Sequence, residues 1–533
     1  MNYGHIRKLA ALVVIIAIFT AIYPVRAEAL AGRFNSSYIY FGRSSAYADL
    51  VDNTENSLNQ VSPCYFELNT DGTLQLNSSL DTNFITAMHA RGIKVVPFLS
   101  NQWDRQTGIT ALQSGEKLAQ QLADAIQQYQ LDGVDIDIEN LTQNEKALYV
   151  NFTRILRAKL PEGKSITVAV AANPNGWING WQGSYDYAGL AQYCDHLVIM
   201  AYDEHYQGSA EGPVASAGFA EGSIKYALKY VTPDKLVLGI PFYGRFWKQG
   251  SAYGGYGLSN YRAEEFINTY SGTVMFDKTS QSPNAIITIK PEDEKPTVLG
   301  KPLEAGTYSI WYENEQSMKY KLWLVQKYNL KGTATWSLGQ EGLGTWSYYR
   351  LWLDGRYFTD VDGHWAQSSI YKAVQNGWMM GATSTEFMPD QPLTRAQAAV
   401  VLTRMLGLKT SAEKASYKDT RNHWAWKEIE AASEAGIVKG LGDGYFGPEN
   451  RITREQMSVI LDRLLVSLEY PAGVANTFTD VSITTSPWSY DSILKMSYYG
   501  IMQGYSESSF KPGYTLTRAQ MAALMERIQG YMQ

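Results

Sequence analysis

The chain is poor in the residues that bind metals and form disulfides. Its 533 residues include two cysteines, Cys64 and Cys194, and six scattered histidines, no two of which have the spacing of a paired metal ligand. We therefore expect neither a metal centre nor a cofactor. A disulfide is the alternative to two free thiols, but the strands assigned below would hold the cysteines far apart, so buried thiols are favoured.

The chain also lacks a large charge excess. Lys and Arg number 46 against 52 Asp and Glu, which leaves a net charge of -6. Such a mildly acidic protein is not expected to have nucleic acid or an anionic membrane surface as its main partner. Aromatic residues are abundant instead, with 37 Tyr and 14 Trp, and their flat rings often stack on sugars as well as filling cores.

Long apolar runs are confined to the N-terminus. Residues 9–23 are apolar, follow a basic start and precede a small-x-small pattern that ends at Ala27. These features predict a secretory signal peptide over residues 1–27, cleaved after Ala27 or Ala29. Its removal would take the net charge to -9, because it carries three basic residues and no acidic ones. An uncleaved anchor is disfavoured, because a membrane span needs about 20 apolar residues.

Strand-like and helix-like segments alternate from residue 36 to about residue 349. This βαβα order is typical of a parallel sheet, and eight strands in about 310 residues predict an α/β fold, the (β/α)8 TIM barrel. We assign this predicted domain to residues 34–350. The eight expected strands are residues 36–42, 61–68, 92–100, 131–139, 165–173, 195–203, 235–244 and 331–339.

The connection between the seventh and eighth strands is too long for one helix. Residues 246–330, approximately, contain the strand-like stretches AIITIKPED and YSIWYENE, so we predict a small α+β insertion there. It would form one wall of a cleft at the C-terminal mouth of the barrel, where the active sites of such barrels lie.

Three repeats follow the predicted barrel. The motif TRAQ, TREQ, TRAQ begins at Thr394, Thr453 and Thr517 and so recurs after 59 and 64 residues. Each copy combines an aspartate turn, a helix opening near a tryptophan, a Phe-x-Pro loop and a second helix capped by the threonine. We predict a mainly α-helical unit whose repeats span residues 357–408, 416–468 and 477–533.

The segment LDGVDIDIEN, residues 131–140, places acidic side chains at alternate positions of a predicted strand. Side chains alternate between the two faces of a strand, so Asp135, Asp137 and Glu139 share one face. In a barrel these acids would point toward the axis, with Glu139 nearest the C-terminal mouth. Their repulsion and burial would keep at least one of them protonated near neutral pH, as a general acid requires.

Three alternative roles for the acidic strand are disfavoured. A calcium loop needs polar residues and a glycine at its sixth position, whereas Ile136, Ile138 and Asn140 intervene here. A purely structural cluster would leave buried carboxylates unpaired, which is costly. A metal-dependent site lacks closely spaced histidine ligands.

The acidic strand resembles the D-x-x-D-x-D-x-E signature of glycoside hydrolase family 18. Asp132, Asp135, Asp137 and Glu139 occupy its acidic positions. The resemblance implies that Glu139 protonates the glycosidic oxygen, and that Asp137 and Tyr202 hold the 2-acetamido group of the substrate. The carbonyl oxygen of that group would attack the anomeric carbon and give an oxazolinium intermediate with net retention. Asp135 would share a proton with Asp137, whereas Asp132 is interpreted as structural.

Later predicted strands carry further motifs similar to those of this family. MAYD spans residues 200–203, GIPFYGR spans residues 239–245, and a tryptophan ends the eighth strand. The resemblance implies that the aspartate of MAYD steadies the distorted sugar and that the tryptophan forms the floor beneath it. The tyrosine and arginine of GIPFYGR either line the cleft or brace the insertion. The expected substrate-binding residues are Asp203, Met200, Trp336, Tyr243 and Arg245.

The acetamido requirement limits the implied substrate to glycans that contain β-1,4-linked N-acetylglucosamine. The stretches YDEHYQGSAEGPVAS and YSIWYENE are similar to the branch of the family that includes bacterial cortex-fragment-lytic N-acetylglucosaminidases. Peptidoglycan is therefore the favoured polymer, and a chitinase is the alternative.

The three repeats resemble S-layer homology domains. The FTDV start is present in the first and third copies and altered to YKDT in the second, and Arg395, Arg454 and Arg518 lie in the helix-opening motif. The resemblance implies binding of pyruvylated secondary cell-wall polysaccharide, in which a guanidinium faces the acidic ketal. The alternative is that each arginine braces its neighbour. The implied location is the cell surface of an organism with a Gram-positive type wall.

Two further hypotheses compete with a wall-anchored glycosidase. Some barrels of this family are lectins that bind sugar without cleaving it, but they usually lose the terminal acid, and Glu139 is present here. A structural surface-layer protein with a vestigial barrel is disfavoured by the full set of motifs.

Overall fold

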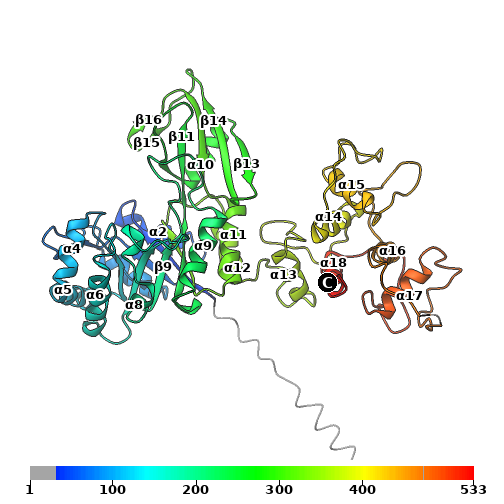
Figure 1. Ribbon diagram of the computed structural model, residues 1–533, viewed down its shortest axis with the longest axis horizontal. Coiled ribbons are helices and arrows are strands. Elements are labelled where there is room, and N and C mark those ends of the chain that lie inside the picture. The colour runs from blue at the N-terminus through cyan, green and yellow to red at the C-terminus, as the bar shows by residue number, and fades with distance from the viewer. Residues whose placement is uncertain (1–31, 472, 533) are drawn as a thin grey trace, which may run out of the picture. The chain divides into compact units, whose positions relative to one another are not determined.

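The computed structural model describes residues 32–471 and 473–532 (Figure 1). The signal peptide predicted over residues 1–27 lies outside these residues and stays a prediction. Within the described residues, no helix has both the length and the apolar character that crossing a bilayer requires.

Parallel strands form a ring at the centre of the first domain. Neighbouring strands pair in chain order, and the last strand, β18, pairs with both β10 and the first strand, β1. The pairings therefore close into a ring. The TIM-like α/β domain predicted from the sequence is therefore confirmed. Its strands are β1 (Phe34–Ile39), β2 (Gln60–Pro63), β3 (Phe66–Leu68), β5 (Lys94–Val95), β6 (Phe98–Ser100), β7 (Gly133–Asp137), β8 (Ser165–Ala171), β9 (His196–Met200), β10 (Leu236–Pro241) and β18 (Gly332–Trp336).

Two of the expected strands are broken in the middle. The strand expected at 61–68 consists of β2 and β3, and the one expected at 92–100 consists of β5 and β6. Pro97 explains the second break, because proline has no backbone N–H to donate to a neighbouring strand. Pairing continues on both sides of the breaks, β2 with β5 and β3 with β6, and β4 (Leu74–Leu76) adds an antiparallel partner to β3.

Amphipathic helices cover the outside of the ring (Figure 1). In α5 (Gly115–Gln128), Leu118, Leu122 and Ile126 recur every four positions and are fully buried. They belong to the same apolar core as the outward side chains of β7, Val134 and Ile136. The other helices of this domain are α2 (Tyr47–Asp52), α3 (Thr82–Ala90), α4 (Arg105–Gln113), α6 (Lys146–Lys159), α7 (Gly180–Gly183), α8 (Tyr187–Ala191), α9 (Ala217–Ala227), α11 (Glu315–Lys327) and α12 (Thr345–Leu353).

An antiparallel sheet with one helix lies between β10 and β18 in the chain. Its strand order is β12-β11-β17-β14-β13, and α10 follows β12. Glu313 and Lys321 fix this segment to α11 through an ion pair of 2.7 Å whose side chains are only 1% and 2% exposed. The elements are β11 (Tyr243–Lys248), β12 (Tyr256–Ser259), α10 (Asn260–Thr269), β13 (Thr273–Asp277), β14 (Ser282–Ile289), β15 (Thr297–Val298), β16 (Lys301–Pro302) and β17 (Gly306–Trp311).

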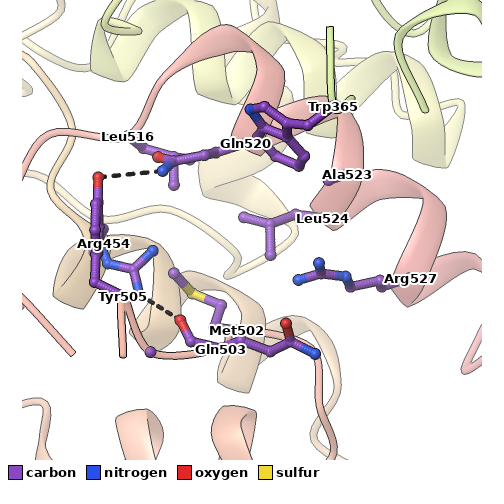
Figure 2. A pocket seen from close by; sticks show the side chains of 11 residues that line it. Trp365, Arg454, Met502, Gln503, Tyr505, Leu516, Gln520, Ala523, Leu524 and Arg527 are labelled. Atoms are coloured by element: carbon purple, nitrogen blue, oxygen red, sulfur yellow. Dashed lines mark hydrogen bonds between the residues drawn. The ribbon is translucent and has the colours of Figure 1, made fainter. Parts of the chain in front are cut away.

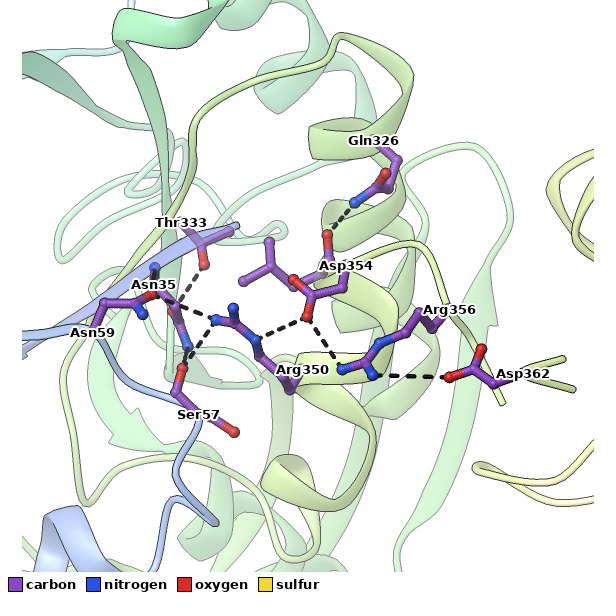
Figure 3. A network of polar contacts seen from close by, with 10 residues as sticks. Asn35, Ser57, Asn59, Gln326, Thr333, Arg350, Asp354, Arg356 and Asp362 are labelled. Carbon is purple, nitrogen blue, oxygen red and sulfur yellow. Dashed lines mark hydrogen bonds and ion pairs between the residues drawn. The ribbon is translucent and has the colours of Figure 1, made fainter. Parts of the chain in front are cut away.

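A polar network ties α12 to the first and last strands of the ring (Figure 3). Arg350 donates from Nε to Asp354, 2.9 Å, and from Nη1 to the carbonyl of Ser57, 3.3 Å. Asn35 on β1 donates to the same carbonyl and accepts from Thr333 on β18. The network therefore holds the last helix of the domain against the place where the ring closes.

Each C-terminal repeat contributes two helices. Thr394, Thr453 and Thr517 cap the second helix of each repeat, and the glutamine three residues later completes a capping box. The aspartate of each repeat start, for example Asp360, accepts backbone N–H bonds from the Phe-x-Pro loop. The helices are α13 (Gln367–Gln375), α14 (Arg395–Leu406), α15 (Trp426–Glu434), α16 (Arg454–Leu464), α17 (Tyr490–Tyr498) and α18 (Arg518–Gln529).

Three backbone hydrogen bonds join the repeats in a cycle. The N–H of Leu393 donates to Leu516, that of Leu516 to Ile452, and that of Ile452 to Leu393, at distances of 2.9, 2.9 and 3.0 Å. The same three side chains are almost fully buried in one apolar core. Because repeat 3 bonds to repeat 1, the three copies form a closed unit rather than an open array.

Both cysteines are free and buried, as the sequence predicts. Burial raises the pKa of each thiol to about 12. We expect the native protein to react with Ellman's reagent at pH 8 at least about 100-fold more slowly than the protein in guanidinium chloride, because the thiolate is the reactive form. Absorbance at saturation should show two thiols per denatured chain, and rapid labelling of the native protein would contradict their burial.

Candidate functional site

Strand β7 places two carboxylates inside the ring and a third just beyond its end. Asp135 and Asp137 are buried, with exposed fractions of 1% and 6%, and Glu139 follows the strand by two residues. The intervening Val134 and Ile136 are fully buried on the opposite face. The alternation of a strand thus separates an acidic inner face from an apolar outer face.

The two inner aspartates are incompletely hydrogen-bonded. Tyr38 donates its hydroxyl to Asp135 Oδ2, whereas Oδ1 of Asp135 and Oδ1 of Asp137 have no hydrogen-bond partner among the described residues. Burial raises the pKa of Asp135, an effect that the nearby hydroxyl of Thr167 and then the bond from Tyr38 oppose. Burial, the charge of Glu139 and then that of Asp135 raise the pKa of Asp137 well above its usual range.

Glu139 is the last of the three alternating acidic residues, and its backbone is held by two hydrogen bonds. Asn101 accepts from its N–H and donates to its carbonyl, each at 2.9 Å. Burial, followed by the nearby charge of Asp203, raises the pKa of Glu139 to about 7. This carboxyl therefore exists in both protonation states near neutral pH and can give and take a proton.

The MAYD and GIPFYGR motifs meet beside these acids. Asp203 accepts from the hydroxyl of Tyr243 at 2.7 Å and from Nε and Nη2 of Arg245 at 3.0 and 2.7 Å. Tyr202 packs edge-on against Tyr243 with 6.2 Å between ring centroids, and its pKa is raised well above the usual range by burial and by the charge of Asp137. The last residue of β9, Met200, is buried at the same end.

These groups line one cavity, which we call the catalytic cavity. It has a volume of about 710 Å³ and is bounded by Asp137, Glu139, Met200, Tyr202, Asp203, Tyr243 and Trp336, among others. Trp336 is the last residue of β18, and its ring lies 5.3 Å from that of Tyr38. The structure thus places all predicted barrel residues in this lining except Asp135, which accepts a hydrogen bond from Tyr38, and Arg245, which lines an adjoining cavity together with Asp203, Tyr243 and Trp336.

The sequence predictions missed several aromatic residues that line the catalytic cavity. Trp103 and Trp177 come from the loops that follow β6 and β8, and Trp181 lies in α7. Trp103 and Trp177 expose about half of their surface (52% and 51%). Exposed tryptophans just after predicted strand ends were the available signal. Tyr38 also lines the cavity, and its inward position on β1 could have been inferred from strand alternation.

Asp132 has no part in the cavity. Its Oδ2 accepts from the N–H of Val95 at 2.8 Å and lies 2.9 Å from Nε2 of His89, which agrees with the structural role predicted for it. Among the described residues, no group of three or more His, Cys, Asp or Glu side chains could hold a metal ion.

The three repeat arginines lie at the contacts between repeats. Arg395 donates from Nε to Phe446 and from Nη2 to Lys439, Arg454 donates to Phe510 and Gln503, and Arg518 donates to Phe387 and Met380, always to backbone carbonyls of the next repeat in the cycle. All three are buried, with exposed fractions of 6–8%. The bracing contact that the sequence left as an alternative is therefore present in each case.

Residues from all three repeats line a groove beside Arg454 (Figure 2). Its volume is about 210 Å³, and it is lined by Trp365 of the first repeat, Arg454 of the second, and Gln503, Tyr505 and Arg527 of the third. Arg527 donates from Nη1 to the carbonyl of Ile501 at 3.0 Å. Two guanidinium groups and an exposed tryptophan thus border one groove.

A barrel-type ring with buried carboxylates at its mouth is suited to a glycosidase, in which carboxyl groups act as acid and base. Comparison with known families agrees: the model for glycosyl hydrolases family 18 matches residues 37–341, and that for the S-layer homology domain matches residues 357–399, 416–458 and 477–522. The chain belongs to glycosyl hydrolase family 18 and carries three S-layer homology repeats. Because lectins of this family usually lose the terminal acid, the presence of Glu139 together with this family match favours the enzyme over the lectin alternative.

Two curated relatives and one solved structure are similar to parts of this chain. The cortical fragment-lytic enzyme of Bacillus subtilis is 25% identical over 228 residues, which are 42% of this chain and 50% of that enzyme. The S-layer protein EA1 of Bacillus anthracis is 31% identical over 171 residues, 32% of this chain and 19% of that protein. The chain thus spans half or less of either relative's length. A chitinase from Chromobacterium violaceum shares the fold, with a TM-score of 0.53 at 24% identity over 60% of this chain and 99% of that one.

The raised pKa of Glu139 makes a prediction about stability. An unfolded Glu ionises near 4.5 and the folded one near 7, so the unfolded chain loses its proton first and stability falls between these pH values by about 3 kcal/mol. Glu139→Gln should remove this penalty, leaving the variant more stable than wild type at pH 8 and equal to it at pH 4. Urea unfolding at both pH values would measure the difference.

Glu162→Gln on an exposed loop is the matched control for this comparison. It should unfold like wild type at both pH values. A wild-type protein and a Glu139→Gln variant with the same pH dependence would show that the carboxyl is not perturbed.

Proposed function

We propose that this chain is an exported, wall-anchored hydrolase that cleaves β-1,4-linked N-acetylglucosamine glycans with retention of configuration. The observation that carries the proposal is the position of Glu139, whose pKa is about 7, at the mouth of a cavity shared with Asp137, Tyr202 and Trp336. The favoured polymer is peptidoglycan, and chitin is the alternative. No cofactor or metal enters the proposed reaction.

In this mechanism the substrate supplies the nucleophile. Glu139 donates its proton to the glycosidic oxygen while the acetamido carbonyl oxygen attacks the anomeric carbon, which gives an oxazolinium ion. Asp137 and Tyr202 orient the acetamido group. The deprotonated Glu139 then activates a water, which attacks the anomeric carbon and opens the oxazolinium ring. Asp135, held by Tyr38, exchanges a proton with Asp137 as the charge of Glu139 changes.

The remaining barrel residues would bind the sugar. Trp336 supplies a flat face under the distorted ring, and Met200 completes the apolar wall. Asp203 accepts from sugar hydroxyls while Tyr243 and Arg245 fix its orientation through three hydrogen bonds. The antiparallel insertion, which contributes Arg245, forms one wall of the cleft.

Two findings favour peptidoglycan. One curated relative is a cortical fragment-lytic enzyme, and the region that contains the S-layer homology repeats is similar to an S-layer protein. An enzyme held at the cell surface meets wall glycan at high local concentration. The fold shared with a chitinase keeps chitin oligomers as the second candidate substrate.

We further propose that the repeats anchor the enzyme to the wall of a Gram-positive type envelope by binding pyruvylated secondary cell-wall polysaccharide. The groove of Arg454, with its second guanidinium from Arg527 and the exposed ring of Trp365, supports this proposal. Arg395 and Arg518 would bind the polysaccharide at the equivalent positions of the other two repeat contacts. Nε and Nη2 of these arginines already donate to backbone carbonyls of the neighbouring repeat. Each arginine would therefore hold two repeats together and also face the ligand.

Glu139→Gln tests the reaction. Mass spectrometry after incubation with peptidoglycan should show fragments with N-acetylglucosamine reducing ends for wild type. The variant should bind N-acetylglucosamine oligomers yet turn them over at least about 10²–10⁴-fold more slowly, because it cannot donate the proton. Chito-oligomer products alone would indicate a surface-bound chitinase, whereas full activity of Glu139→Gln would overturn the assignment of the acid.

Removal of residues 358–533 tests the anchor. The shortened protein should remain in the supernatant when mixed with purified walls of the source organism, and it should still hydrolyse soluble oligomers, since the anchor and the catalytic cavity use different residues. Full-length Glu139→Gln is the control and should sediment with the walls. Sedimentation of the shortened protein would contradict the anchoring role.

A further inference from the structure

A second cavity adjoins the catalytic cavity at the insertion. It has a volume of about 450 Å³ and shares Asp203, Tyr243 and Trp336 with the first. Its other walls include Phe41, from the loop after β1, and residues of the insertion. The cleft therefore does not end at the tryptophan floor but continues beyond it.

The second cavity lies on the glycone side of the bond that is cleaved, if the function proposed above holds. The acid Glu139 lines the catalytic cavity and is absent from the lining of the second. Because the acid protonates the leaving oxygen, the departing sugars occupy the Glu139 side. The part of the chain that keeps the anomeric carbon then passes over Trp336 into the second cavity.

The walls of the second cavity suit a sugar ring. Phe41, Tyr261 and Leu299 are exposed by 49%, 41% and 72%, so their apolar faces are available for stacking. Asn260, which opens α10, is almost fully buried, and its N–H donates to the carbonyls of Phe242 and Gln340. The first turn of α10, which carries Tyr261, is thus held in place relative to the barrel.

The same cavity carries an excess of positive charge. Its lining contains Arg245, Arg262 and one carboxylate, Asp203, which Arg245 and Tyr243 already satisfy. Arg262 stacks over Phe266, and its ion-pair partner on the same helix, Glu265, has its carboxylate oxygen 3.8 Å from Nε, beyond hydrogen-bond distance. A guanidinium in this setting is suited to a carboxylate on the ligand.

We propose that the second cavity binds a carboxylate-bearing amino sugar on the glycone side of the cleaved bond, with Arg262 as its counter-ion. The lactyl ether sugar that alternates with N-acetylglucosamine in peptidoglycan has a free carboxylate where its stem peptide has been removed, whereas chitin has no carboxylate. Arg262 would then favour peptide-free peptidoglycan strands over chitin. Occupation of this cavity also places the cut inside a chain rather than at its non-reducing end.

A matched pair of substrates tests the proposal with the full-length protein. The first is a peptide-free tetrasaccharide, N-acetylglucosamine and N-acetylmuramic acid in alternation with N-acetylmuramic acid at the reducing end, and the second is the same molecule with its carboxylates converted to methylamides. We expect wild type to cleave the acidic form with about tenfold higher kcat/KM, the size of effect typical of a charge-assisted hydrogen bond.

The acidic substrate carries a carboxylate on each side of the cleaved bond. Variants at Arg262 therefore show which of these carboxylates gives the preference for the acidic substrate. Arg262→Gln should reduce the ratio between the two substrates to near one, and Arg262→Lys should keep most of it. Arg154→Gln, on the outer face of α6 with hydrogen bonds to Asn151, is the control and should keep the wild-type ratio. Thermal unfolding of each variant checks that it folds.

The outcomes separate the two proposals. Equal cleavage of both tetrasaccharides by wild type, or an unchanged ratio in Arg262→Gln, would overturn the role of Arg262 and leave the hydrolase assignment intact. Failure of wild type to cleave these tetrasaccharides and N-acetylglucosamine oligomers would overturn the proposed function and, with it, this inference.

Discussion

The repulsion among carboxylates buried on one strand is the constraint around which the first domain is built. Asp135, Asp137 and Glu139 are brought into a low-dielectric interior, where burial raises the pKa of each. The charges of Glu139 and Asp135 raise the pKa of Asp137 further, and the charge of Asp203 adds to that of Glu139. Burying these carboxyl groups lowers the stability of the folded domain. The rigid packing of the closed ring of strands keeps them in place. Tyr38 bonds to one end of the line and Asn101 fixes the backbone at the other. The proton affinity of Glu139 therefore depends on its burial and on the nearby charge of Asp203.

Local patterns in the sequence predicted more of this domain than of its cleft. The alternation along residues 131–139 was enough to predict which face of β7 is acidic, because that period is a property of one strand. Trp103 and Trp177 were missed since the loops that carry them have no period, and Trp103 follows another residue of positive φ, Gln102. The arginine contacts between repeats were equally hidden, because Arg395 reaches carbonyls 44 and 51 residues further along the chain.

The insertion shows how a barrel gains a second binding surface without disturbing the first. Its sheet contributes Arg245 to the support of Asp203, and its helix presents Tyr261 toward the adjoining cavity. The buried pair of Glu313 and Lys321 anchors the segment to α11, and such a pair is costly to break once both charges are desolvated. Substitutions in the insertion can therefore change which substrate is selected without altering the acidic residues of β7.

The cycle of backbone bonds through Leu393, Ile452 and Leu516 has a consequence for the order of events during folding. No repeat can complete its contacts with one neighbour alone, because the unit closes only when the third copy bonds to the first across more than 120 residues. Contacts of such long sequence separation form late, after the entropy of a large loop has been lost. A ribosome must therefore synthesise the third repeat before the unit of three repeats can assemble, whereas the barrel has all of its strands much earlier.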